Sequence, residues 1–171
     1  MDGDVVRSNL RSFVGLTAVA LALVAVVRFG SYESPPPPEP WRPTAGFVAA
    51  ETVALGGDRT LRLWTAPSAW SVESLVDGRH AGAVSAWGDV DRYTVDEVLG
   101  GFLGDVPVTD AHAVSVRTHD GATVRARLYD RRFLVPGHVA GPTEPALLVT
   151  PLDAAGRPLS AETSVPIAGR T

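Results

Sequence analysis

Residues 113–129 read AVSVRTHDGATVRARLY and predict an antiparallel β-hairpin. Valine alternates with polar or charged residues on both sides of an Asp-Gly pair, which is the period-two pattern of a strand with one buried face. Two connections fit this turn, and they give different registers. A two-residue turn at Asp120–Gly121 would set valines opposite arginines, whereas a three-residue loop, 119–121, sets Val116 opposite Val124. We expect the longer loop, because it separates apolar from charged residues and puts the glycine where φ is positive.

This register gives the hairpin two unlike faces. The inner face is apolar and consists of Val114, Val116, Val124, Ala126 and Leu128. The outer face consists of Ser115, Arg117, Thr123, Arg125, Arg127 and Tyr129, and Arg131 and Arg132 follow in the next turn. Guanidinium groups suit bidentate recognition of phosphate or carboxylate, so Arg117, Arg125 and Arg127 are our candidate binding residues for an anionic partner. The alternative is a solvated strand face that needs such residues only for solubility.

Further strands are expected on both sides of the hairpin. Turn sequences separate them, such as GGDR at 56–59 and DAAGR at 153–157. The expected strands are 47–55, 61–66, 133–136, 146–152 and about 158–165. The pattern predicts a mainly β domain, either an antiparallel β-sandwich or a small barrel. Three tryptophans are expected in its core rather than in a sugar-stacking groove: Trp64, Trp70 and Trp87.

One short helix is expected inside this β domain. Thr94 has the character of an N-cap, and Glu97 stands at the third helical position, as in a capping box. Gly100–Gly101 would then end the helix.

Residues 12–29 predict a membrane anchor ahead of the domain. They contain the uncharged run SFVGLTAVALALVAVV, and the flanking Arg11 and Arg28 can extend a short apolar helix by reaching toward the lipid headgroups. The run also has the length of a signal peptide, but no suitable pair of small residues follows it as a cleavage site. We therefore expect an uncleaved signal anchor that contacts membrane lipid. The predicted order is a tail at 1–11, a transmembrane helix at 12–29, a Pro-rich linker at 30–46 and the β domain at 47–171.

The orientation of this single-pass anchor rests on weaker signals. Arginines are equally frequent on its two sides, so the positive-inside rule does not decide. A stiff proline linker is most useful outside the cell, and we therefore expect an extracytoplasmic domain on a bacterial membrane. Small residues on one face of the anchor suggest a homodimer contact, with simple alanine abundance as the alternative: Gly15, Ala18, Ala22 and Ala25.

The charge composition limits the partners. The chain has 15 basic residues, all arginine, and a net charge of −4, which argues against nucleic-acid binding. Arginine without lysine, together with abundant Ala, Val, Gly and Pro, is typical of a GC-rich genome. The charge is unevenly distributed: residues 41–110 carry −5 and residues 111–171 carry +2.

The turns and alternation resemble a known type of domain. GDVPVTDAHAVSVRTHDGATVRARLYDRRFLVP at 104–136 and LLVTPLDAAGRPL at 147–159 look like the C-terminal β domain of small membrane-anchored or secreted actinobacterial proteins. Those proteins carry cysteines earlier in the domain, and this chain has none. The resemblance covers about a third of the chain. It implies a location and a fold, and it implies no activity.

No motif for catalysis, metal binding or a cofactor is present in the sequence. Nucleophile elbows, P-loops and dinucleotide fingerprints are missing, and the lack of cysteine excludes thiol chemistry. The four histidines are expected to be exposed: His80, His112, His119 and His138. A loose calcium site is the alternative for Asp89, Asp91 and Asp96. We therefore expect a non-catalytic binding domain, with an envelope enzyme whose site is hidden in the linear sequence as the alternative.

Overall fold

The structure is a computed structural model that describes residues 40–44, 46–118 and 120–170. These residues form two β-sheets and one short 3₁₀ helix, η1 (Gly137–Val139), and they contain no α-helix. The prediction of a mainly β fold is therefore confirmed. The predicted anchor, the tail and most of the linker lie outside the described residues. Within the described ranges, no helix has the length and apolar character needed to cross a bilayer.

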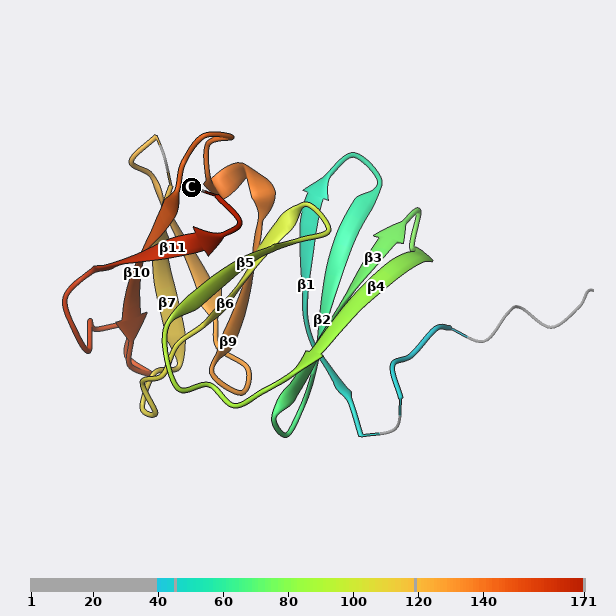
Figure 1. The fold of residues 1–171 in the computed structure, drawn as a ribbon, viewed down its shortest axis with the longest axis horizontal. Helices are drawn as coiled ribbons and strands as arrows, with labels where there is room; N and C mark the ends of the chain where they lie inside the picture. The colour runs from blue at the N-terminus through green and yellow to red at the C-terminus, as the bar shows by residue number, and fades with distance from the viewer. Residues whose placement is uncertain (1–39, 45, 119, 171) are drawn as a thin grey trace, which may run out of the picture. The chain divides into compact units, whose positions relative to one another are not determined.

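The first sheet is a four-stranded antiparallel meander in which each strand pairs with the preceding one (Figure 1). Its strands are β1 (Val48–Gly56), β2 (Arg59–Ala66), β3 (Ala69–Val76) and β4 (Arg79–Trp87). The predicted hairpin of 47–55 and 61–66 is confirmed as β1 and β2, with Val53 opposite Leu61. Asp77 and Gly78 join β3 to β4 with φ of 51° and 72°, the geometry of a tight hairpin turn.

The second sheet has seven strands and curls into a nearly closed barrel (Figure 1). Its spatial order is β8-β7-β10-β11-β5-β6-β9, which leaves β8 and β9 at the two ends. The strands are β5 (Thr94–Val98), β6 (Gly101–Asp105), β7 (Ala113–Arg117), β8 (Thr123–Arg127), β9 (Arg132–Pro136), β10 (Ala146–Leu152) and β11 (Thr163–Ala168). One pairing departs from the predicted antiparallel arrangement. β11 runs parallel to β5, with Ile167 opposite Val95, because the chain reaches this neighbour by a long return and not by a hairpin.

The hairpin at 113–129 has the register that its apolar pattern predicts. β7 and β8 pair with Val116 opposite Val124 and Val114 opposite Ala126. Thr118 donates its N–H to the carbonyl of Ala122 at 2.8 Å, which closes the longer loop. The hairpin therefore has the register in which its apolar side chains share the buried face.

Residues 94–101 form a hairpin, so the predicted helix is wrong. β5 pairs with β6, and Val98 lies opposite Gly101. Leu99 and Gly100 have φ of 52° and 89°, which makes them a two-residue turn. A capping pattern alone cannot stabilise one turn of helix, since a helix this short gains little from its own hydrogen bonds. As a strand the segment buries Val95 and Val98.

The last strand begins later than predicted. β11 starts at Thr163, and Pro158 makes only an isolated bridge to Leu152. Pro158 has no N–H to donate, and the hydrogen bond from the N–H of Leu159 to the carbonyl of Pro151, at 2.9 Å, is not continued as a regular ladder.

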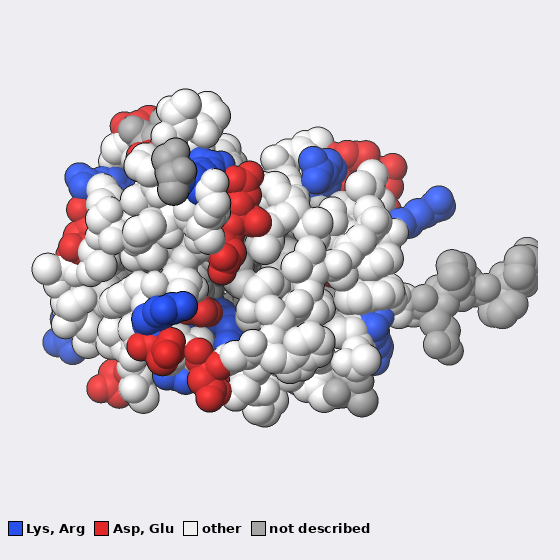
Figure 2. Space-filling view, viewed as in Figure 1, with Lys and Arg blue, Asp and Glu red and all other residues white. Residues whose placement is uncertain are grey.

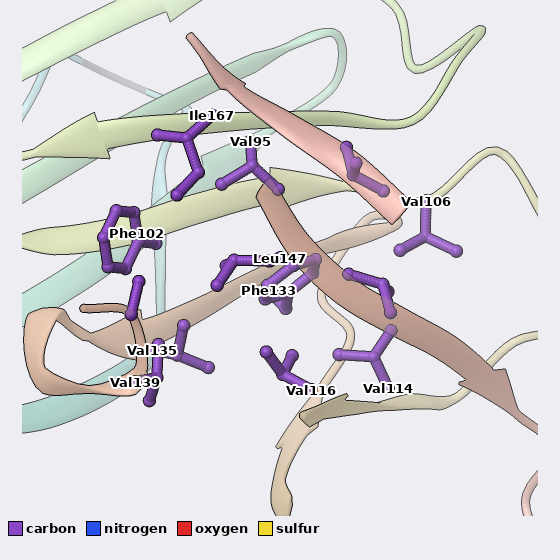
Figure 3. Close-up of a cluster of buried hydrophobic side chains, with 13 residues drawn as sticks. Val95, Phe102, Val106, Val114, Val116, Phe133, Val135, Val139, Leu147 and Ile167 are labelled. Carbon is purple, nitrogen blue, oxygen red and sulfur yellow. The ribbon is translucent and has the colours of Figure 1, made fainter. Parts of the chain in front are cut away.

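The inside of the barrel is a continuous apolar core (Figure 3). It is formed by Val95, Phe102, Val106, Val114, Val116, Phe133, Val135, Val139, Ala140, Leu147, Val149, Val165 and Ile167. Burying a side chain of this size contributes about 1.5–3 kcal/mol. The ring of Phe133 lies directly over Gly104 on the neighbouring strand, where an added Cβ would stand 2.2 Å from a ring carbon. The packing of this ring therefore requires glycine at 104.

A second apolar cluster lies between the two sheets. Leu61, Leu63 and Val72 of the first sheet pack against Val98, Leu103 and Leu134 of the second. Because successive side chains of a strand point to opposite faces, β6 and β9 are buried on both sides, with their phenylalanines in the barrel and their leucines between the sheets.

The tryptophans divide between core and surface. Trp64 is buried and Trp70 packs against the cluster between the sheets, as predicted. Trp87 is 75% exposed, so its predicted place in the core is wrong. It is the last residue of β4, an edge strand, where its ring extends beyond the packed part of the sheet.

Candidate functional site

A groove of about 490 Å³ lies beside β8 and contains two of the three predicted arginines. It is lined by His112, Ala113, Arg125, Arg127, Leu128 and Ala154, and we call it the arginine groove. Arg125 and Arg127 are two residues apart on one strand, so both side chains leave the same face of the sheet, away from the core. Both residues are exposed.

Arg125 lies against the turn at 153–157, which forms one wall of the groove. A Cβ added to Gly156 would stand 2.9 Å from Nη1 of Arg125, so the guanidinium packs closely against the backbone of this turn. The φ of Gly156 is +80°, which favours glycine. Among the described residues, Arg125 has no hydrogen bond or ion pair. Its charge therefore has no partner within that part of the chain.

The carboxylate of this turn, Asp153, is held by Arg157. Oδ1 of Asp153 accepts the backbone N–H of Arg157 at 2.8 Å, and Oδ2 accepts its Nε at 2.8 Å. The backbone hydrogen bond from Arg157, with its side chain, holds the pKa of Asp153 below the ordinary value of 3.8. Asp153 thus closes the turn and does not neutralise the groove.

Arg127 is positioned by stacking. Its guanidinium carbon lies 5.8 Å from the ring centre of Tyr129, within the range of a cation–π contact. Tyr129 is fixed in turn by donating its O–H to Oε2 of Glu51 on β1, at 3.2 Å. Burial, and then the charge of Glu51, raises the pKa of Tyr129. Stacking occupies the flat face of a guanidinium, and its in-plane N–H donors suit bidentate recognition of an oxyanion.

Arg117 is on the same sheet face but has a partner. Its Nη2 lies 2.7 Å from Oε1 of Glu162, with the two side chains 47% and 39% exposed. An exposed pair of this kind contributes about 0–1 kcal/mol to stability. The structure therefore brings Arg125 and Arg127 together in the groove and places Arg117 outside its lining.

Arg131 and Arg132 do not belong to this face. Arg132 is only 2% exposed and donates from Nη2 to the carbonyl of Gly88 at 2.7 Å. It also bonds Asp130 at 3.1 Å, and its Nε lies 3.2 Å from Oδ1 of Asp105, too poorly aligned for a hydrogen bond. Arg131 donates to the carbonyl of Val90 at 2.9 Å. Both arginines therefore hold the segment that connects the two sheets.

The histidines have unequal roles. His112, predicted only to be exposed, lines the arginine groove next to β7 and adds a nitrogen donor or acceptor there. Its neighbour Ala113 lies opposite Arg127. The predicted register already implies this cross-strand pair, so the sequence could have indicated that His112 lies near Arg127. His138 is exposed, and His119 is outside the described residues. No group of three His, Asp or Glu side chains in the described part of the chain is arranged to hold a metal ion.

A polar cluster on the first sheet was not predicted. Glu73 is 1% exposed and accepts hydrogen bonds from Nε1 of Trp64 and from Nδ1 of His80, each at 3.1 Å. Arg62 lies 3.6 Å from the same carboxylate. Trp41, at the end of the predicted linker, stacks on His80 with ring centres 4.4 Å apart. The carboxylate is satisfied within the cluster, and the cluster attaches the start of the domain to the sheet.

Comparison with protein-family models, with curated proteins and with solved structures finds no match for this chain.

Proposed function

We propose that the protein is a single-pass, membrane-anchored envelope protein whose non-catalytic β domain binds an anionic component of the envelope in the arginine groove. One observation carries the proposal. Arg125 and Arg127 both line the arginine groove, and neither has an ion pair with a carboxylate among the residues described. Two such guanidinium groups on one wall suit a ligand that supplies the missing negative charge, because charge-assisted hydrogen bonds to an oxyanion are strong.

The ligand class follows from the chemistry of the groove. Planar guanidinium groups favour phosphate or carboxylate oxygens, and His112 supplies a further polar group beside them. The distribution of net charge also favours an anionic ligand, because residues 111–171 carry +2 whereas residues 41–110 carry −5. Because the arginines are exposed, the binding is expected to weaken as salt screens the charges, over a Debye length of about 10 Å at 0.1 M.

The anchor is the second part of the proposal. The uncharged run within 12–29 and the six prolines between 34 and 43 favour a membrane segment followed by an extended spacer. At about 3.1 Å per residue, a spacer of this kind would hold the domain roughly 30 Å from the bilayer.

Retention on immobilised anionic polymers tests the groove. We expect the full-length chain in an uncharged detergent to be retained on polyphosphate or polyglutamate beads at low salt, and the stronger of the two identifies phosphate or carboxylate as the ligand group. Changing Arg125 and Arg127 together to Ser should reduce retention at least about tenfold, equivalent to about 1.4 kcal/mol. The same change should alter the free energy of unfolding by no more than about 0.5 kcal/mol, since both sites are exposed.

Arg117→Ser is the matched control, because Arg117 lies on the same sheet face but is paired with Glu162. It should retain the polymer almost as well as the unchanged chain. Equal losses in the control and in the double variant, or no retention at low salt, would reject the groove as a binding site.

Fusion reporters test the anchor separately. A phosphatase joined after residue 171 should be active, and a fluorescent protein that matures only in the cytoplasm should be dark there. Mass spectrometry of the native protein should find residues 1–30 intact. A mature chain that begins near residue 31 would contradict the uncleaved anchor and leave the groove unaffected.

A further inference from the structure

β4 is an exposed edge strand, and its last six residues, 82–87, lack the features that usually block edges. It pairs with β3 on one side only, and most of its nine residues are exposed. Residues 81–87, AGAVSAW, contain no charge and no proline. In the view of Figure 2, the surface where β4 lies in Figure 1 is mostly free of charged side chains. Proteins commonly protect such edges with lysine, proline or inward charges, and an unprotected edge is a template for another strand.

Exposed apolar side chains are concentrated on this strand. The described residues contain four large apolar side chains with high exposure, at Val48 (68%), Val84 (41%), Trp87 (75%) and Leu159 (40%). Two of the four belong to β4. A β-bulge at Ala81, opposite the step between Ser74 and Leu75, leaves 82–87 as the regular part of the edge.

The backbone of this part is ready for pairing. Gly88 donates its N–H to the carbonyl of Ser68 at 2.8 Å, so it faces β3. Along an antiparallel strand, alternate residues direct their N–H and C=O groups to opposite sides. Ala83, Ser85 and Trp87 therefore direct theirs away from β3, toward the open edge.

We propose that the occupant of this edge is β4 of a second copy of the chain, paired antiparallel about a two-fold axis at Val84. This register sets the two valines opposite each other and Ala83 opposite Ser85 of the second copy. It joins two four-stranded sheets into one, and it removes both exposed valines from water. The inference does not depend on the function proposed above.

Charge favours a second copy in this direction. Arg79 lies at the start of β4, and Asp89 and Asp91 follow its end. An antiparallel pair brings Arg79 of each copy near Asp89 of the other, whereas a parallel pair would set arginine beside arginine. Like charges directly opposite each other destabilise a strand pair.

Single cysteines in the full-length chain test this pairing, because the chain has no cysteine of its own. Val84→Cys should form a disulfide-linked dimer under mild oxidation, since directly opposite Cβ atoms in such a pair lie about 4.5–5.5 Å apart. Val48→Cys is the matched control: it is more exposed and lies on β1, at the other edge of the same sheet. It should cross-link at least about tenfold more slowly, a difference of about 1.4 kcal/mol.

A second change, made in the Val84→Cys chain, tests whether the edge itself is responsible. Ala83→Pro removes an N–H that faces the open edge, so it should preserve the fold and reduce cross-linking of that chain about tenfold. If the thermal melt shows that the proline variant is unfolded, Ala83→Lys replaces it and should have the same effect by placing like charges near the axis. Equal cross-linking rates for Val84→Cys and Val48→Cys would overturn the pairing. So would cross-linking of the Val84→Cys chain that persists after a change at 83 that leaves it folded.

Discussion

The two sheets differ in where their cores come from. The barrel encloses an apolar core of its own, built from six of its strands, whereas the four-stranded meander buries its apolar face against β5, β6 and β9 of the barrel. The meander consists of hairpins between neighbouring strands, but the barrel depends on distant pairs such as Ile167 with Val95. The meander therefore needs the barrel for its stability more than the barrel needs the meander.

The two sheets also differ in what their buried charged side chains bond. In the meander, the carboxylate of Glu73 lies on the face away from the barrel and is satisfied by Trp64 and His80. At the barrel, the guanidinium of Arg132 lies at the junction and bonds the carbonyl of Gly88, in the connection between the sheets. Glu73 therefore stabilises a single sheet, whereas Arg132 couples the two sheets.

The largest effect is expected from Phe133→Ala, because its ring fills the centre of the barrel core. Loss of a fully buried phenylalanine costs about 3–5 kcal/mol in the free energy of unfolding, including the cavity that remains. Trp87→Ala removes a larger side chain from the meander, but at 75% exposure it should cost no more than about 0.5 kcal/mol. Urea unfolding of both variants measures the difference. Similar losses would mean that the pairing of β4 with a second copy, proposed above, also buries the ring of Trp87.

Arg132→Ala should follow, at about 3 kcal/mol, because breaking a buried pair leaves an uncompensated charge. Asp105 and Asp130 would lose their cation, and the connection at Gly88 would lose its donor. Arg157→Ala is the control, since its pair with Asp153 is highly exposed on the arginine side and contributes about 0–1 kcal/mol. If the two alanine variants unfold at the same urea concentration, Arg132 does not couple the sheets.

Sequence reasoning was most successful where structure is local. The hairpin at 113–129 and the pair of β1 and β2 follow from alternation and turn residues. The helix predicted between Thr94 and Gly100 was wrong because the capping pattern carries no information about the pairing of β5 with β6. The parallel neighbours β5 and β11 are separated by most of the domain, and no local pattern specifies such a pair.

The candidate site was predictable in part for the same reason. The predicted register of one hairpin placed Arg125 and Arg127 on a common outer face, and the structure has the same register. It could not show that the turn around Gly156, from another strand connection, forms the groove wall. Nor could it show that Glu162 pairs with Arg117, because that contact joins residues 45 apart in the sequence.

A smaller difference in stability between the two sheets is expected when a glycine in each is changed to alanine. Gly104→Ala would place a Cβ 2.2 Å from the ring of Phe133 and should cost about 1–3 kcal/mol by overpacking. Gly82→Ala on β4 has no atom within 4 Å of the new Cβ and should change stability by less than about 0.5 kcal/mol. Thermal melts of the two variants give the comparison. A destabilised Gly82→Ala would mean that the second copy proposed above approaches Gly82 too closely to admit a methyl group.

The smallest effect concerns two carboxyl groups whose pKa values move in opposite directions. Burial raises the pKa of Asp105, at the junction of the sheets, above its ordinary value of 3.8, despite a hydrogen bond from Thr94 and the charge of Arg132. The hydrogen bonds from Arg157 lower the pKa of Asp153, in the exposed turn. Asparagine at either position removes the titration, so the difference from the unchanged chain isolates each group.

The signs of the two effects follow from which state binds the proton. Just above pH 3.8, the folded chain still binds a proton at Asp105 that the unfolded chain has lost, so the unchanged chain should gain stability relative to Asp105→Asn as pH falls through the raised pKa toward 3.8. Asp153 is the reverse case: its ionised form is favoured by folding, and that contribution is lost as pH falls below 3.8. Relative to Asp153→Asn, the unchanged chain should therefore lose stability, and only at the acid end. Urea midpoints at a series of pH values measure both differences. If the two stability differences change in the same direction with pH, the attraction of Arg132 for the ionised Asp105 outweighs the effect of burial.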